Sequence, residues 1–193
     1  MTAGISLEML VADGEEGGEV YSVANKLDQA KIIYKSCYNM VQSSAVLSKK
    51  IRKTRTSLEF GTSELLPLAS DSKSLDGLNP SLAIYDEGHA TKTMDLYDVI
   101  DSAFGAREQP LFIHITTAGT EREGLYDYLY DRAEKLLNGL QEDDTFLPFI
   151  YELDSEEEYA QEEMWQKSNP NIDVSVDREY LRAKVEKAKS DIA

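Results

Sequence analysis

Two adjacent acids, Asp86 and Glu87, are the residues with the clearest chemical potential, and they lie in the stretch S-L-A-I-Y-D-E-G-H-A from Ser81 to Ala90. The apolar run Leu82 to Tyr85 directly before them is typical of a short buried strand. In an open parallel sheet, ligands bind beyond the carboxyl ends of the strands. A nucleotide hydrolase places two acids there, one that organises magnesium and one that activates water. The alternative is an ordinary strand end with a solvated acidic turn, because the chain has 36 acidic residues and other acid pairs.

A second polar segment follows the strand-like run L-F-I-H-I. Thr116, Thr117 and Gly119 supply two hydroxyl groups and a flexible glycine there, which could sense a phosphate, although such a segment is more often a simple turn. Of the two histidines, His114 lies mid-strand and is interpreted as a core residue. His89 follows the acid pair and could link it to neighbouring loops. Neither histidine has companions at metal-ligand spacing, so a zinc site is not expected.

A phosphate-binding loop of the form G-x-x-x-x-G-K-[ST] is absent from these 193 residues. Such a loop supplies backbone amides at a helix N-terminus together with a lysine. The glycine-rich stretch D-G-E-E-G-G at Asp13 to Gly18 is acidic and precedes a strand, which makes it a poor phosphate site.

Composition limits the class of protein. A length of 193 residues with 41% hydrophobic residues is enough for one domain, or one domain and a tail, with a packed core. No apolar run is long enough to span a membrane, and no secretory signal is recognised at the N-terminus. Cys37 is the single cysteine, which excludes an internal disulfide and fits a reducing cytoplasm. The net charge of -16 opposes DNA binding, so a chain acting on DNA would need basic surface from another segment or partner.

Strand-like and helix-like segments alternate along the chain, which predicts an α/β domain with a mainly parallel sheet. Strands are expected at Val20 to Ala24, Leu82 to Tyr85, Leu111 to Thr116 and Phe146 to Leu153, with an irregular hairpin at Thr56 to Leu68 and a polar loop at Ser70 to Pro80. Helices are expected at Thr2 to Val11, Leu27 to Val41, Ser44 to Ile51, Met94 to Phe104, Leu125 to Leu140 and Arg178 to Ala188. The composition changes after Asp154, where an acidic helical tail begins.

Several of these segments, taken in order, resemble the ATPase domain of the large terminase subunit of tailed bacteriophages. The matching stretches are E-V-Y-S-V-A followed by Asp28 to Ala30, S-L-D-G-L-N-P at Ser74 to Pro80, A-I-Y-D-E-G-H-A at Ala83 to Ala90, L-Y-D-V-I at Leu96 to Ile100, I-T-T-A-G at Ile115 to Gly119 and M-W-Q-K-S-N-P-N-I at Met164 to Ile172. The resemblance implies a RecA-like P-loop ATPase sheet. It also implies that Asp86 is the magnesium-organising Walker B acid and Glu87 the catalytic glutamate. Thr116, Thr117 and Gly119 match the coupling motif that passes the nucleotide state to the DNA-translocating parts, and they would be the cofactor-binding residues.

The resemblance further implies a packaging motor that uses Mg²⁺ and ATP to move double-stranded viral DNA in the cytoplasm of the bacterial host. Its partners would be the portal, the small terminase subunit and further copies in a ring, with no membrane role. Residues 1–154 would be a partial ATPase domain and residues 155–193 an acidic linker or helical subdomain. The family's Walker A loop precedes the segment matching Thr2 to Val11, and its nuclease domain follows the tail. We therefore expect an incomplete subunit with weak nucleotide affinity.

Two other functions stay open at this point. The chain could be a non-catalytic remnant or interaction protein that docks to the portal or small terminase subunit. It could also be a helicase-like P-loop ATPase, although D-E-G-H departs from the D-E-A-H of such helicases. Arg52, Arg55 and Arg107 are the candidates for an arginine finger, with nothing in the sequence to choose between them.

Overall fold

The computed structural model describes residues 1–69, 77–91, 93–119 and 124–192. Contacts within the chain divide it into two compact units, Met1–Arg132 and Ala133–Ala193, which are described separately here. The domain boundary expected after Asp154 rests on composition and resemblance and stays a prediction. Most of the polar loop expected at Ser70 to Pro80, with the first part of the S-L-D-G-L-N-P match, lies outside the described residues.

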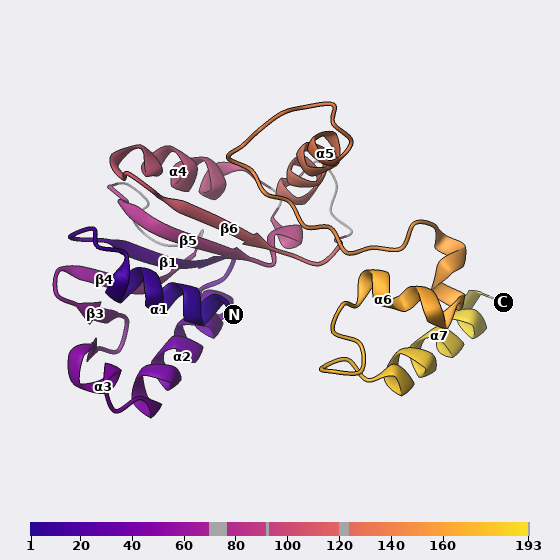
Figure 1. The fold of residues 1–193 in the computed structure, drawn as a ribbon, viewed down its shortest axis with the longest axis horizontal. Coiled ribbons are helices and arrows are strands. Elements are labelled where there is room, and N and C mark those ends of the chain that lie inside the picture. Colours follow the sequence, from indigo (N-terminus) through magenta and orange to yellow (C-terminus); the bar gives the residue numbers. More distant parts are fainter. Residues whose placement is uncertain (70–76, 92, 120–123, 193) are drawn as a thin grey trace. The chain divides into compact units, whose positions relative to one another are not determined.

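The first unit is built on a six-stranded sheet in the order β2-β3-β4-β1-β5-β6 (Figure 1). Strand β1 (Glu19–Ala24) lies between β4 (Ser63–Ala69) and β5 (Pro80–Asp86) and is parallel to both. Strand β6 (Leu111–Ile115) is parallel to β5. The short strands β2 (Arg52–Lys53) and β3 (Leu58–Phe60) extend the sheet in antiparallel fashion, and β3 and β4 form the expected hairpin. The mainly parallel sheet confirms the predicted RecA-like class.

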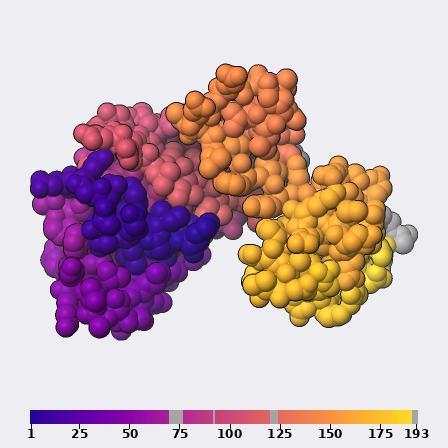
Figure 2. Space-filling view, in the orientation of Figure 1, coloured from indigo at the N-terminus to yellow at the C-terminus, as the bar shows by residue number. Residues whose placement is uncertain are grey.

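Helices cover both faces of the sheet because its central strands are apolar on both sides. On one face, α1 (Thr2–Ala12) and α2 (Leu27–Ser43) pack on residues such as Val20, Leu82 and Ile84. On the other face, α4 (Asp95–Ala103) and the start of α5 (Leu125–Leu137) pack on Tyr21 and Tyr85. Figure 2 shows α1, in indigo, on the outside of this unit. The short elements α3 (Leu47–Lys50), η1 (Gly88–Ala90) and η2 (Phe104–Ala106) complete it.

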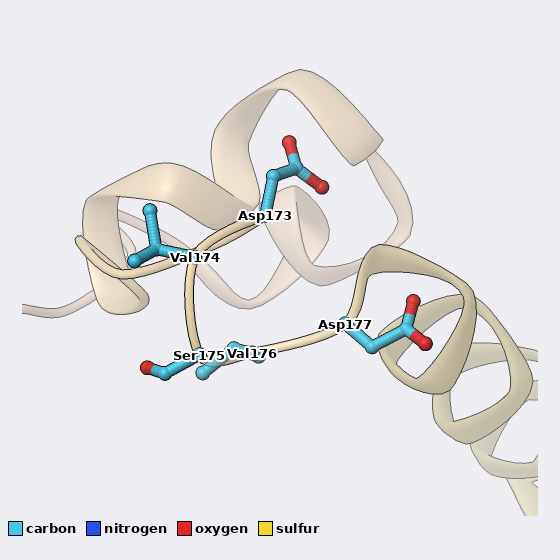
Figure 3. Close-up of a pocket in the computed structure, with 5 residues that line it drawn as sticks. All are labelled: Asp173, Val174, Ser175, Val176 and Asp177. Carbon is cyan, nitrogen blue, oxygen red and sulfur yellow. The ribbon is translucent and has the colours of Figure 1, made fainter.

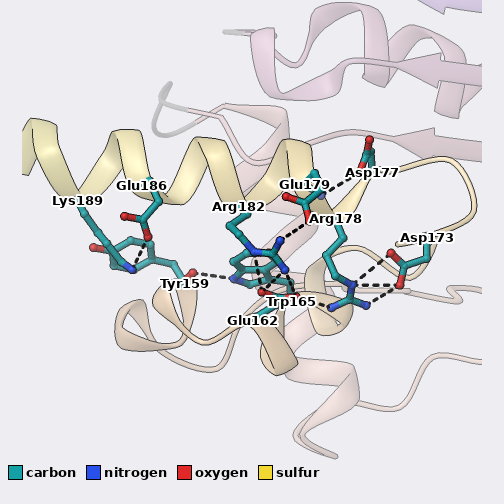
Figure 4. A network of polar contacts seen from close by, with 10 residues as sticks. All are labelled: Tyr159, Glu162, Trp165, Asp173, Asp177, Arg178, Glu179, Arg182, Glu186 and Lys189. Carbon is teal, nitrogen blue, oxygen red and sulfur yellow. Dashed lines mark hydrogen bonds and ion pairs between the residues drawn. The ribbon is translucent and has the colours of Figure 1, made fainter.

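The second unit is mostly helical and contains η3 (Glu156–Ala160), η4 (Glu162–Met164), α6 (Trp165–Ser168) and α7 (Arg178–Ile192). Trp165 is its buried anchor, and its indole Nε1 donates a hydrogen bond of 2.7 Å to the carbonyl oxygen of Tyr159. Two arginine side chains join α7 to the preceding segments of this unit by ion pairs. Arg182 pairs with Glu162 at 2.8 Å, and Arg178 pairs with Asp173 at 2.7 Å (Figure 4).

The strand expected at Phe146 to Leu153 is wrong. This segment has no regular secondary structure, and Leu147, Phe149 and Tyr151 are exposed. Its apolar composition suits a strand, but a strand forms only where a neighbour accepts and donates its backbone hydrogen bonds. None of the six described strands pairs with it.

The turn from Asp173 to Asp177 encloses an open hollow of about 330 Å³ (Figure 3). Its acids are already engaged, because Asp173 binds Arg178 and Asp177 accepts a hydrogen bond from the backbone of Glu179 at the start of α7. Both carboxylates at the hollow therefore take part in holding the start of α7. Among the described residues, no helix has both the length and the apolar composition needed to cross a membrane.

Candidate nucleotide-binding site

The acid pair and the threonine segment meet at one edge of the sheet. Strands β5 and β6 are parallel neighbours, and Asp86 at the end of β5 is registered opposite Ile115 at the end of β6. The backbone N–H of Glu87 continues the ladder by donating to the carbonyl oxygen of Ile115 at 2.9 Å. The segments that follow the two strands, which contain Glu87 and Thr116, therefore start side by side at the carboxyl edge, where ligands of open α/β sheets bind.

The backbone of Glu87 is left-handed, with φ 58° and ψ 43°. For a residue other than glycine or asparagine this conformation costs about 1 kcal/mol or more. It ends the strand at Asp86 and starts the single turn η1, so the chain leaves the sheet plane immediately after the two acids. Strained positions of this kind are concentrated at functional sites, where surrounding structure holds them in place.

The charges of Asp86 and Glu87 favour binding of a cation. Burial raises the pKa of Asp86, the neighbouring Glu87 charge raises it further, and a hydrogen bond from the Glu87 backbone partly opposes the rise. The Oε2 atom of Glu87 is buried without a hydrogen bond. Magnesium is typically held by one or two carboxylates, with water and phosphate oxygens completing the shell. Asp86 and Glu87 fit that requirement, and the part of the chain that the structure describes holds no cluster of three or more acidic, histidine or cysteine ligands.

His89 joins the acid pair to the threonine segment. Its Nδ1 atom lies 2.9 Å from Oε2 of Glu87, an ion-pair distance, although the angles do not make a hydrogen bond. The same Nδ1 lies 3.2 Å from Oγ1 of Thr116, and the backbone N–H of His89 donates to that hydroxyl at 2.9 Å. The link between the acid pair and a neighbouring loop that the sequence suggested for His89 is therefore present.

Gly119 lies close enough to His89 to exclude a side chain at position 119. A methyl group there would come within 2.7 Å of Cβ and 3.1 Å of the carbonyl oxygen of His89. The glycine is thus required by a close approach of two loops rather than by its backbone angles. Thr116, Thr117 and Gly119 all lie beside η1, while residues 120–123 lie outside the described part of the chain.

A hydrogen-bonded group of Asn25, Tyr85 and Thr91, which the sequence did not reveal, fixes the residue that follows η1. The hydroxyl of Tyr85 and the hydroxyl of Thr91 both donate to Oδ1 of Asn25, at 3.2 and 2.8 Å, and lie 3.1 Å from each other. The carbonyl oxygen of Thr91 accepts a hydrogen bond of 3.4 Å from Leu125 at the start of α5. A polar residue directly after a buried strand, as Asn25 is, was the available signal, but its partner lies 66 residues away.

The arginine-finger candidates lie elsewhere. Arg107 is at the opposite end of β5, where its buried guanidinium binds Glu15 at 3.1 Å and the carbonyl oxygen of Asn79 at 3.1 Å. Arg52 pairs with Glu59 across β2 and β3 and is exposed, and Arg55 is exposed in the following turn. Arg107 therefore has a structural position, and its guanidinium is not available at the carboxyl edge.

Comparison with known proteins decides the family. The model of the family described as "Terminase large subunit, ATPase domain" matches residues 1–135. The chain belongs to the terminase large subunit family, in its ATPase domain. The match covers the sheet, the acid pair and the threonine segment, so the family resemblance seen in the sequence is confirmed.

Individual relatives of this terminase chain are longer than it is. It is 27% identical to the large terminase subunit of Enterobacteria phage HK97 over 97% of its own length and 38% of that protein. It is 39% identical to protein YmfN of Escherichia coli K12 over 60% of its length and 26% of that protein. The crystal structure of the HK97 bacteriophage large terminase superposes with a TM-score of 0.84 at 26% identity, covering 97% of this chain and 40% of that one. The chain therefore spans about a quarter to two fifths of these relatives.

Proposed function

We propose that this chain provides the Walker B and coupling part of a nucleotide site in a phage DNA-packaging motor that uses Mg²⁺ and ATP. The observation that supports it best is the meeting of Asp86, Glu87 and the Thr116–Gly119 segment at the carboxyl edge of two neighbouring parallel strands. Phosphoryl transfer needs a metal-organising acid and a group that orients water. A motor also needs a contact that reports the state of the phosphate. These residues supply one candidate for each task.

In this proposal Asp86 holds the metal ion, which would neutralise phosphate charge. Its raised pKa reflects a carboxylate in a partly buried place beside a second acid, so a bound cation would relieve that unfavourable charge. Glu87 lies beyond the strand end and is 43% exposed, so it can accept a proton from a water molecule on the solvent side. Thr116 and Thr117 are exposed hydroxyl groups beside it that can contact a phosphate oxygen.

The substrate, partners and location that we propose for this chain are those that the family implies. We infer that the complete motor acts on double-stranded viral DNA with a portal and a small terminase subunit, as a ring of copies, in the host cytoplasm. The likeness to the large terminase subunit of phage HK97 supports this role. With a net charge of -16, this part of the motor would contribute ATP hydrolysis and coupling rather than binding to DNA.

The experiment uses Mn²⁺ as a paramagnetic substitute for magnesium. In spectra of the ¹⁵N-labelled chain, Mn²⁺ with ATP should broaden the amide signals of residues 86–89 and 115–119. Asp86→Asn should abolish that broadening, because one metal-binding carboxylate is lost. This readout detects weak binding and does not require turnover.

The control addresses the acidity of the chain, because Mn²⁺ also collects on exposed carboxylates. Glu142→Gln removes an exposed acid far along the sequence and should leave the broadening at 86–89 intact. Broadening that is spread over the acidic segments and unchanged by Asp86→Asn would contradict the proposal.

A further inference from the structure

The positive charge of this acidic chain is concentrated in one stretch. Residues 26–55 contain eight lysine and arginine residues and a single acid, Asp28, although the whole chain has 36 acidic residues and 20 basic ones. The stretch comprises α2, α3 and β2 (Figure 1). Its exposed part, which we call the basic surface, therefore has a charge opposite to that of the chain as a whole.

The three elements of the basic surface form one continuous patch. Lys31, Lys35 and Tyr38 follow one another at positions i, i+4 and i+7, so they share one side of α2. The ammonium group of Lys53 in β2 lies 5.5 Å from the ring centroid of Tyr38. Helix α3 follows α2 in the chain and contacts it. The positive charges of α2, α3 and β2 therefore lie together.

Most of these charges are not neutralised within the described part of the chain. Lys31 pairs with Asp28 at 3.6 Å, and Arg52 pairs with Glu59. No ion pair is found among the described residues for four exposed members of the surface, which are Lys35, Lys49, Lys50 and Arg55. Neighbouring like charges repel one another, so a partner that brings negative charge is favoured here.

Apolar side chains are interleaved with the charges of the basic surface. Ile32 and Met40 on α2 are 57% and 46% exposed, and Val46 between α2 and α3 is 62% exposed. Lys35 follows Ile32 by three residues and lies beside it on the helix. A fitting partner therefore has acidic groups and apolar side chains close together. A protein segment can supply both, whereas the backbone of a DNA duplex presents phosphates without apolar side chains.

The chain itself contains a segment with these properties. Residues 142–157, which we call the acidic segment, contain seven acids and no basic residue. Within it, Leu147, Phe149 and Tyr151 are between 58% and 78% exposed. Residues 146–153 have no regular secondary structure, so this part can lie along a surface without the loss of a helix or strand. The acidic segment thus complements the basic surface in charge and in apolar character.

We propose that the basic surface of one copy of this chain binds the acidic segment of a second copy. The two contacting parts are different, so the contact is heterologous, and a pair of copies keeps one free surface and one free segment. Such contacts continue from copy to copy and close into a ring where the rotation between copies allows it. The ring rests on the proposed function, whereas the contact itself requires neither nucleotide nor DNA.

Zero-length carbodiimide cross-linking of an equal mixture of ¹⁴N- and ¹⁵N-labelled chains tests the contact. The reagent joins a lysine amine to a carboxylate that touches it, and mass spectrometry gives the isotopes of both linked peptides. The salt concentration is about 150 mM, where charges more than about 8 Å apart are screened. We expect links between residues 26–55 and 142–157 in which ¹⁴N is joined to ¹⁵N as often as like is joined to like.

Charge reversal measures how much the two parts contribute. Lys35→Glu with Lys49→Glu should lower the association constant at least about tenfold, because like charges then face each other. Sedimentation over a range of protein concentrations gives this constant. Adding Glu142→Lys and Asp144→Lys to the same chain restores the net charge of the parent and places opposite charges together again. This chain with four substitutions should therefore recover most of the association.

Lys184→Glu with Lys187→Glu is the matched control, because it changes the net charge by the same amount at exposed positions of α7. It should lower the association constant far less than the change on the basic surface. Equal losses in the two variants would assign the association to overall charge and overturn the proposal.

The isotopes decide between a contact of two copies and its alternatives. If no mixed-isotope pair joins the two regions, whether the links lie within one chain or do not form, the proposal is overturned. If duplex DNA protects the lysines of the basic surface from the reagent and mixed pairs are absent without DNA, the surface is a DNA contact instead. Failure of Mn²⁺ and ATP to bind at Asp86 would refute the proposed function and leave the cross-linking result standing.

Discussion

At the scale of single residues, the site combines positions that sequence could identify with contacts that it could not. Asp86 and Glu87 were found because an apolar run ended in two acids, which is a local pattern. The left-handed backbone of Glu87 and the approach of His89 to Thr116 depend on β5 and β6 being neighbours. Such contacts join residues 27 positions apart, and no local pattern encodes them.

His114 gives a prediction for the pH dependence of stability. It packs against Phe112, Tyr97 and Tyr85, and its Nδ1 is buried without a hydrogen bond. Burial, and then the charge of Arg132, lowers the pKa of His114 from 6.5 to about 4. Between these pH values the unfolded chain binds more protons than the folded one, so stability falls as the pH falls through that window.

We expect His114→Phe to remove this part of the pH dependence. The variant should lose less unfolding free energy than the parent between pH 6.5 and 4, by up to about 3 kcal/mol. Urea unfolding at several pH values gives the unfolding free energy of each protein as a function of pH. The contributions of other titrating groups cancel in the difference between the parent and the variant. Parallel curves for His114→Phe and the parent would disprove the explanation.

At the scale of elements, Arg107 connects the loop before β1 to the loop before β5. Its guanidinium binds the carboxylate of Glu15, the carbonyl oxygens of Glu16 and Asn79 at 3.1 Å each, and the carbonyl oxygen of Gly17. Its side chain is only 6% exposed. These bonds lie at the amino edge of the sheet, opposite the candidate site, and they fix where β1 and β5 begin.

Arg107→Met should therefore lower the unfolding free energy by about 3 kcal/mol, because a partly buried carboxylate and several carbonyl groups lose their donor. Arg52→Met is the comparison, since Arg52 is 75% exposed in its pair with Glu59 and exposed pairs contribute less than about 1 kcal/mol. Urea unfolding of both variants gives the numbers. Equal effects would show that the network at Arg107 contributes no more than a surface ion pair.

The elements themselves were largely predictable from sequence, with one instructive failure. The strands around the site and the helices Thr2–Ala12 and Leu27–Ser43 follow from apolar periodicity and strand-like composition. Phe146 to Leu153 has the same strand-like pattern, yet it forms no strand. Pattern describes which side chains could share a face, whereas a strand also requires a neighbouring backbone. The sequence of one segment does not show which other segment will pair with it.

At the scale of the whole molecule, charge is the dominant property. The net charge of -16 predicts that this chain binds duplex DNA weakly, because phosphate neutralisation dominates such binding. Titration of a fluorescent duplex at about 150 mM salt should give a Kd weaker than about 100 μM, the weak end of non-specific binding. Low salt should tighten it little, since few phosphates are neutralised.

The single basic segment, Lys49 to Arg55, provides the counter-test. A Kd below about 10 μM that weakens steeply with salt would show a local basic surface strong enough to overcome the overall charge. In that event Lys49→Gln together with Lys50→Gln should weaken the binding and reduce its salt dependence, because two of the five positive charges of the segment are lost.

The exposed side chains of Leu147, Phe149 and Tyr151 have a consequence for the behaviour of the chain in concentrated solution. They form an exposed apolar stretch that is interrupted by Pro148, and exposed apolar patches favour association between chains. Mutual repulsion between chains of charge -16 keeps these stretches apart at low ionic strength. Added salt shortens the range of that repulsion to about 10 Å at 0.1 M. Colloidal stability of this protein should therefore decrease with ionic strength, the reverse of ordinary salting-in.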